Sequence, residues 1–78
     1  MNYDFTIVIE PDGEGFHAFV PVLPGCHTFG NTLDETRANI AEALELHLEC
    51  MIEDGEDIPL ETAPYFVTRL SVPLPLPV

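Results

Sequence analysis

The stretch from Thr32 to Gly55, TLDETRANIAEALELHLECMIEDG, decides the fold of this 78-residue chain. Apolar residues recur in it at spacings of seven, four, four and three, the periodicity of one face of an α-helix. Thr32 and Glu35 have the spacing of a capping box, in which each side chain accepts a hydrogen bond from the other residue's backbone N–H. Gly55 can adopt the left-handed conformation that ends a helix. We therefore expect a long helix whose apolar stripe faces a sheet: Leu33, Ile40, Leu44, Leu48 and Met51.

The far side of this predicted helix is acidic, as is the chain as a whole. Glu42, Glu45 and Glu49 follow one another at helical spacing on the face away from the stripe. The chain has 14 Asp and Glu residues against two Arg and no Lys, a formal net charge of -12. Recognition of a phosphate backbone needs clustered cations, so this charge argues against binding of nucleic acid and favours a cationic partner.

Upstream of the helix, the sequence predicts three short strands. Apolar and polar residues alternate over residues 3–10, and a turn-forming segment, Pro11 to Gly15, connects them to a second strand over 16–20. Pro24 and Gly25 favour a type II turn, in which glycine takes the positive φ, before a third strand over 26–30. An antiparallel sheet of consecutive strands is the expected result.

Downstream of the helix, residues 65–72 are rich in β-branched and aromatic side chains and predict a final strand. In residues 73–78 every second residue from Pro73 is proline, so this tail cannot pair as a central strand. It is either a free end or an extended arm that docks in a groove on another subunit. We expect an α+β domain of order β-β-β-α-β over residues 1–72, with one helix on one face of the sheet, and a separate proline-rich tail.

The sequence offers no convincing set of catalytic or metal-binding residues. Asp4 and Glu10 lie on the first predicted strand, but no further carboxylates are placed to complete a two-metal site. Adjacent strand residues such as Cys26 and His27 point to opposite faces, which makes them poor joint ligands. We expect no catalysis, no cofactor and no metal, and free thiols at Cys26 and Cys50 in a reducing compartment. The start of the chain is unlike a signal peptide, which favours the cytoplasm.

Four segments, taken in order, resemble the HicB-like antitoxin family: Val8 to Phe16, Pro21 to Cys26, Gly30 to Glu35, and Glu53 to Pro59. The resemblance implies a truncated ribonuclease-H-like fold. It also implies a protein that binds and masks a small basic HicA-type toxin, an mRNA-cleaving ribonuclease. Many members of the family continue into a C-terminal DNA-binding segment, which this sequence lacks, so we expect no direct binding to an operator.

The partner would be held by carboxylates on the helix and at the hairpin tip. The expected partner-binding residues are Asp12, Glu14, Glu42, Glu45 and Glu49. A chain this short buries a thin core, so we also expect a homo-oligomer, a dimer or a tetramer. Two alternatives remain open: an orphan oligomeric scaffold without a toxin partner, and, more remotely, a metal-dependent nuclease using Asp4 or Glu10.

Overall fold

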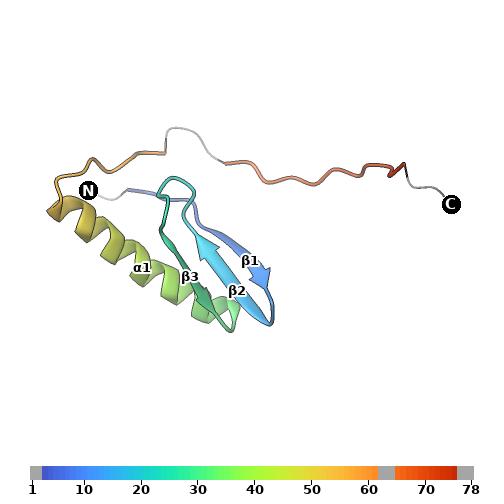
Figure 1. Cartoon of the computed structure of the whole chain (residues 1–78), viewed down its shortest axis with the longest axis horizontal. Helices are drawn as coiled ribbons and strands as arrows, with labels where there is room; N and C mark the ends of the chain where they lie inside the picture. The colour runs from blue at the N-terminus through green and yellow to red at the C-terminus, as the bar shows by residue number, and fades with distance from the viewer. Residues whose placement is uncertain (1–2, 62–64, 76–78) are drawn as a thin grey trace.

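The fold of the chain is a three-stranded antiparallel sheet with one long helix packed on one of its faces (Figure 1). A computed structural model describes residues 3–61 and 65–75. Strands β1 (Val8–Asp12), β2 (Gly15–Phe19) and β3 (His27–Gly30) lie in the order β1-β2-β3, and helix α1 (Leu33–Glu53) follows them. The predicted α+β class, with three consecutive antiparallel strands followed by one long helix, is confirmed.

Two turns set the register of the sheet. In the β1–β2 hairpin Asp12 pairs with Gly15, and Gly13 between them has a φ of 62°. Before β3, the N–H of Cys26 donates to the carbonyl of Leu23 over 3.0 Å, and Gly25 has a φ of 89°. Positive φ at that position is the type II turn expected from Pro24 and Gly25.

Helix α1 begins and ends as its sequence predicts. The hydroxyl of Thr32 accepts a 3.1 Å hydrogen bond from the N–H of Glu35, which is one half of the predicted capping box. At the other end Gly55 has a φ of 72°, and the N–H of Glu56 donates to the carbonyl of Met51 over 2.9 Å. This last hydrogen bond is the signature of a Schellman motif, which reverses the direction of the chain after the helix.

The core lies between α1 and the inner face of the sheet. Its fully buried members come from β2, the following loop and the helix: Ala18, Val20, Leu23, Cys26 and Ile40. Leu44, Leu48 and Met51 pack against them, as the helical periodicity predicts. The prediction was wrong for Leu33, which is 49% exposed. Thr36 is buried in its place. Its hydroxyl can be buried because it donates a 2.7 Å hydrogen bond to the Thr32 carbonyl within the first helical turn.

Strand β1 is shorter at its start than the alternating pattern predicts. Val8 pairs with Phe19, the last residue of β2, so the residues before Val8 have no strand beside them. Instead, a carboxylate supplies the missing partner. Glu61 accepts a hydrogen bond of 2.6 Å from the N–H of Thr6 and another of 2.8 Å from its hydroxyl. This contact ties the segment after α1 to the start of the sheet.

The fourth predicted strand is not formed within the single chain. Residues 65–75 are extended and run away from the body of the molecule, with no strand of the described chain beside them (Figure 1). These residues have the composition of a strand but form no backbone hydrogen bonds to a neighbouring strand of the described chain. Phe66, Val67 and Leu70 are each more than 80% exposed. The end of the predicted proline-rich tail, residues 76–78, lies outside the described residues.

Within the described ranges, no helix combines the length and the apolar character that crossing a bilayer requires.

Candidate protein-interaction surface

The outer face of the sheet, away from α1, carries two copies of the same short pattern. His17-Ala18-Phe19 in β2 and His27-Thr28-Phe29 in β3 both place histidine and phenylalanine on that face, with a small residue between them on the other. The antiparallel register sets His17 opposite Phe29 and Phe19 opposite His27. Each histidine therefore lies across from a phenylalanine. We call these four side chains the aromatic–histidine patch.

The rings of the patch are in mutual contact. The centroid of His17 lies 4.8 Å from that of Phe29, 5.4 Å from that of His27 and 5.6 Å from that of Phe19. His27 and Phe29 meet edge to face at 6.0 Å. Ring pairs at these separations stabilise neighbouring strands and hold one another's rotamers. Because Phe29 is 55% exposed, the cluster presents an apolar surface to solvent.

An acidic edge borders the patch along β1. The Oε1 atom of Glu10 lies 3.3 Å from Nδ1 of His17, which is its register partner across the β1–β2 pair. Strand alternation places Asp12 on the same outer face as Glu10. Carboxylates beside exposed aromatic rings suit a basic side chain of a partner, since a guanidinium can stack on a ring and pair with the acid.

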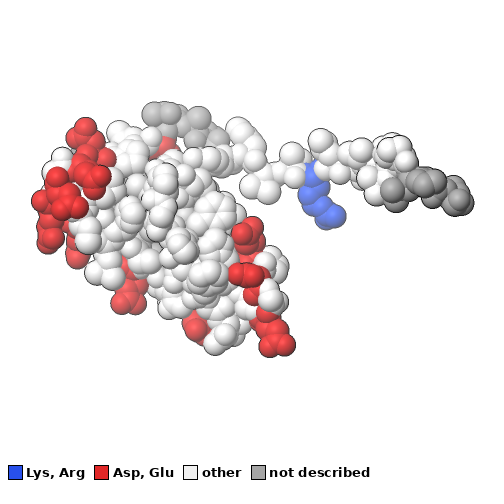
Figure 2. Space-filling model, viewed as in Figure 1, with Lys and Arg blue, Asp and Glu red and all other residues white. Residues whose placement is uncertain are grey.

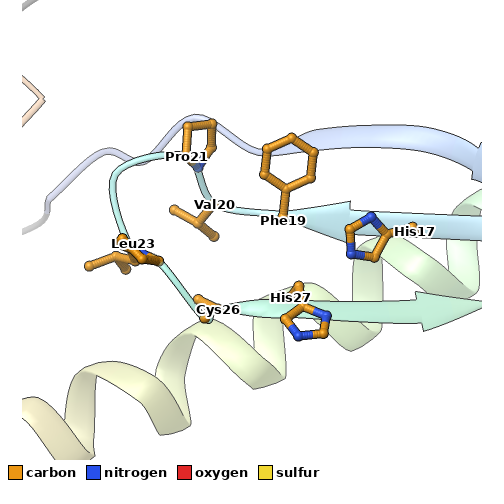
Figure 3. Close-up of a pocket in the computed structure, with 9 residues that line it drawn as sticks. His17, Phe19, Val20, Pro21, Leu23, Cys26 and His27 are labelled. Atoms are coloured by element: carbon orange, nitrogen blue, oxygen red, sulfur yellow. The ribbon is translucent and has the colours of Figure 1, made fainter.

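A shallow hollow continues the patch toward the turn before β3. Figure 3 shows His17 and Phe19 on β2 beside His27 at the start of β3, with Pro21 and Leu23 in the loop that joins the two strands. Cys26 lies at the base of this loop and is buried, and burial raises the pKa of its thiol because the thiolate would lose hydration. The hollow is lined mainly by apolar side chains, with His17 and His27 on the side of the patch.

The carboxylates predicted to bind a partner lie on two separate parts of the surface. Asp12 and Glu14 are exposed at the tip of the β1–β2 hairpin. The other three are exposed along the side of α1 that faces away from the core: Glu42, Glu45 and Glu49. Figure 2 shows acidic side chains in distinct groups over the body rather than in one cluster. The structure brings the hairpin pair close to the aromatic–histidine patch and leaves the helix group on the opposite side of the sheet.

Comparison with known proteins identifies the family. A model of the HicB-like antitoxin of bacterial toxin-antitoxin systems matches residues 5–69. The chain belongs to the HicB-like antitoxin family. This family member is also similar to the solved N-terminal domain of the antitoxin HicB of Burkholderia pseudomallei, with a TM-score of 0.66 and 36% identity over 77% of this chain and 72% of that one.

Other relatives of this HicB-like chain are known by family name alone. A UPF0150 protein of Synechocystis is 42% identical over 60 residues, which is 76% of each chain. A UPF0150 protein of Archaeoglobus fulgidus is 51% identical over 57 residues, 69% of this chain and 83% of the relative. Both matches extend over more than two thirds of this chain.

The outer face of this HicB-like domain has the features of a binding surface. Across residues 3–61 and 65–75, no three His, Cys, Asp or Glu side chains are grouped so that they could hold a metal ion. Asp4 is exposed, and Glu10 contacts His17 instead of a second carboxylate. Exposed rings with an acidic border offer a partner apolar area and charge complementarity.

Sequence reasoning missed the patch of this HicB-like domain, although a signal was present. The sequence pointed to His27 only as a poor metal ligand beside Cys26. The repeated His-x-Phe pattern on two neighbouring strands could have indicated a shared outer face, since alternation puts the first and third residues of each copy together. The pairing of the copies could not be derived from the pattern alone, because register depends on the loop between the strands.

Proposed function

We propose that this chain is the antitoxin of a toxin–antitoxin pair, and that it binds and masks a small basic toxin of the HicA type, an mRNA-cleaving ribonuclease. The observation that carries the proposal is the match to the HicB-like family over residues 5–69, in a chain whose fold also resembles the HicB N-terminal domain. Masking needs no catalysis by the antitoxin. It requires a surface that covers the toxin's RNA-binding face and excludes the RNA sterically.

The charge of the chain supports a basic partner. Of the fourteen carboxylates only Glu61 is partly buried, and the remainder are exposed. Two arginines are the only Lys or Arg residues that could neutralise them. A toxin that binds RNA must carry cationic groups, and the antitoxin's carboxylates can occupy the same groups in place of phosphates. Opposite net charges also accelerate encounter, and this acceleration weakens as salt rises.

The aromatic–histidine patch with its hairpin carboxylates is the contact we favour. Exposed aromatic rings account for much of the binding energy in protein interfaces, whereas scattered surface carboxylates mainly steer association. In this assignment Phe29, His17 and Asp12 contact the toxin directly. Glu42, Glu45 and Glu49 lie on the other side of the sheet and contribute long-range attraction.

The first test is co-purification of the full chain from its native host, with mass spectrometry of the bound proteins. We expect a small basic chain whose expression alone arrests growth and whose ribonuclease activity this protein inhibits. Recovery of no basic protein under low-salt conditions would favour the orphan scaffold instead. Inhibition should then be measured with Phe29→Ala, and with a variant carrying both Glu45→Lys and Glu49→Lys.

The two variants distinguish residues that contact the toxin directly from residues that only attract it at long range. We expect Phe29→Ala to raise the dissociation constant mainly through faster dissociation, because buried apolar contacts are lost. The double lysine variant should slow association at low salt and change dissociation little. The reverse pattern would move the contact surface to the helix. Leu46→Ala, at an exposed apolar position on α1, is the matched control for Phe29→Ala.

A further inference from the structure

An apolar groove runs along one side of the molecule, between the β1 side of the sheet and α1. Two adjoining hollows form it, and both are lined by Tyr3, Phe5 and Leu44. Ile7 and Ile9 continue its wall toward the hairpin, and further residues extend it toward the end of the helix: Leu48, Ile52 and Ile58. Tyr3 is 40% exposed and Ile52 is 64% exposed, so the groove leaves apolar surface in contact with water. Asp4, Arg37 and Glu45 also line the two hollows, so the groove is mainly but not wholly apolar. It suits an extended chain with one apolar face.

The backbone beside this groove is an open sheet edge. Val20, which follows β2, donates its N–H to the carbonyl of Cys26 over 3.1 Å, so the even-numbered residues of β2 turn their backbone groups toward β3. The odd-numbered residues of β2 then turn theirs toward β1. With the observed register, the N–H and C=O groups of Ile7 and Ile9 face away from the sheet. Within the described residues no strand lies beside them.

The other edge of the sheet, along β3, is covered in part by a side chain of α1. The outward carbonyl of Phe29 in β3 accepts a 2.8 Å hydrogen bond from Nδ2 of Asn39 on α1. Such a contact occupies a group that an added strand would need. The two edges therefore differ: β3 is covered in part by the helix, whereas β1 offers free donors and acceptors next to an apolar groove.

The extended segment 65–75, which we call the arm, has the pattern of the missing strand. Its even-numbered side chains form an apolar face interrupted by one threonine: Phe66, Leu70, Val72 and Leu74. All four are more than 65% exposed in the single chain. The positions of the prolines are also compatible with pairing along one side of the arm. Pro73 and Pro75 both have odd numbers, so the N–H groups missing from the arm lie on one side and the other side keeps its donors.

Charge favours the same pairing. None of the fourteen carboxylates lies in the arm, which carries Arg69 instead (Figure 2). Arg69 has an odd number, so it lies on the opposite face of the arm from Phe66 and Leu70, beside Val67 and Ser71. On the β1 side, Glu10 and Asp12 share the outer face, away from α1. If the apolar faces join at the groove, the arginine therefore lies on the same side of the sheet as these acids.

We propose that the arm of one chain adds as a strand to the free β1 edge of a second copy of the same chain, and that its apolar face fills the groove against α1 of that copy. In this structure the arm extends outward from its own body (Figure 1). Reciprocal exchange between two copies fills both grooves and closes with two-fold symmetry. The prolines then lie on the new outer edge, where their missing N–H groups prevent a third chain from pairing.

The test uses the full chain and two substitutions at neighbouring positions of the arm. Leu70→Asp places a charge on the face that enters the groove, whereas Ser71→Asp places the same charge on the opposite face. Analytical ultracentrifugation over a range of concentrations should show a dimer of the 8.6 kDa chain for the wild type and for Ser71→Asp. Leu70→Asp should raise the dimer dissociation constant at least tenfold, with an unchanged circular dichroism spectrum of the helix.

A second measurement identifies where the arm lies without any substitution. An equimolar mixture of isotope-labelled and unlabelled wild-type chains should give NOEs between Leu70 methyl groups of one copy and the rings of Tyr3 and Phe5 of the other. Three results would overturn the proposal: a monomer at all concentrations, contacts only within one copy, or a dimer equally stable in both aspartate variants. If the chain is a monomer and its arm becomes ordered only when a different protein is added, the proposal is likewise overturned.

Discussion

Gly30 at the end of β3 lies against the first turn of α1, and its lack of a side chain lets Thr36 come that close. A Cβ built on Gly30 would lie 2.8 Å from the backbone nitrogen of Thr36 and would also collide with its hydroxyl. Thr36 is fully buried, so neither group has room to move. The contact fixes how closely the helix can approach the sheet.

We therefore predict that Gly30→Ala lowers the free energy of unfolding by about 1–3 kcal/mol, the usual cost of forcing extra volume into a packed site. Urea unfolding followed by circular dichroism measures it. Asn31→Ala, at the exposed neighbouring position, is the control and should change stability much less. Equal midpoints for the two variants would show that the helix can shift away from the strand at little cost.

The hydrogen bond from Asn39 to Phe29 gives a second prediction. Asn39→Ala should lower the free energy of unfolding by about 1 kcal/mol, the net value of a typical hydrogen bond. It should also speed hydrogen exchange in β3 relative to β2, since an edge that loses its cover opens more readily. Glu42→Ala, at an exposed position one turn further along α1, provides the comparison. Unchanged exchange in β3 would contradict a role for Asn39 at the edge.

The buried thiol gives a prediction of pH dependence. Burial raises the pKa of Cys26, so the folded chain keeps this proton at pH values where the unfolded chain has begun to lose it. The contribution of this group is intact below the ordinary thiol pKa of about 8.5, and the free energy of unfolding falls as the pH rises above that value. Cys26→Ala should lower the free energy of unfolding at neutral pH. It should also remove the part of the decrease at alkaline pH that comes from ionisation of this thiol.

Cys50 is the internal control for the buried thiol, because it is exposed and free. A thiol reagent should modify Cys50 quickly and Cys26 slowly at pH 8 in the folded chain, and both at similar rates in urea. Cys50→Ser should leave the alkaline loss of stability as it is in the wild type. Rapid modification of Cys26 in the folded chain would show that the loop above it opens frequently.

A fourth prediction concerns the contact between Glu61 and Thr6. Glu61→Ala removes the acceptor of two hydrogen bonds, so residues 56–61 should detach more often from the start of the sheet. We expect a loss of about 1 kcal/mol in the free energy of unfolding and several-fold faster limited proteolysis between α1 and the arm. Glu56→Ala, in the same segment, controls for the lost charge. Proteolysis at equal rates in both variants would refute this role for Glu61.

The helix and its ends could be predicted because their signals are local. Thr32, Gly55 and the apolar spacing from Ile40 onward act within one or two turns, so the sequence contains all the information they need. Leu33 was misassigned because Thr36, and not Leu33, is the residue of the first turn that lies buried against Gly30. That requirement arises from the approach of two elements and has no periodic signature.

The predicted strand at 65–72 and the aromatic–histidine patch depend on contacts between distant segments, so local sequence patterns could not predict them. The composition of the arm predicts a strand, but a strand forms only when another strand lies beside it, and none does in the described part of the chain. The patch depends on which residue of β2 faces which residue of β3, and the length of the intervening loop determines that register. Charge alone located the predicted carboxylates on the surface without showing that they would divide between two sides of it.

The meeting of Thr6 and Glu61 also has a consequence for protein engineering. Because it brings the beginning and the end of the folded body into contact, a short peptide could join these two points without passing through the core. The chain could then be given new termini at the exposed tip between Gly13 and Glu14. Such a circular permutant would keep the sheet and helix while releasing the body from the arm, so that each could be produced and titrated as a separate molecule.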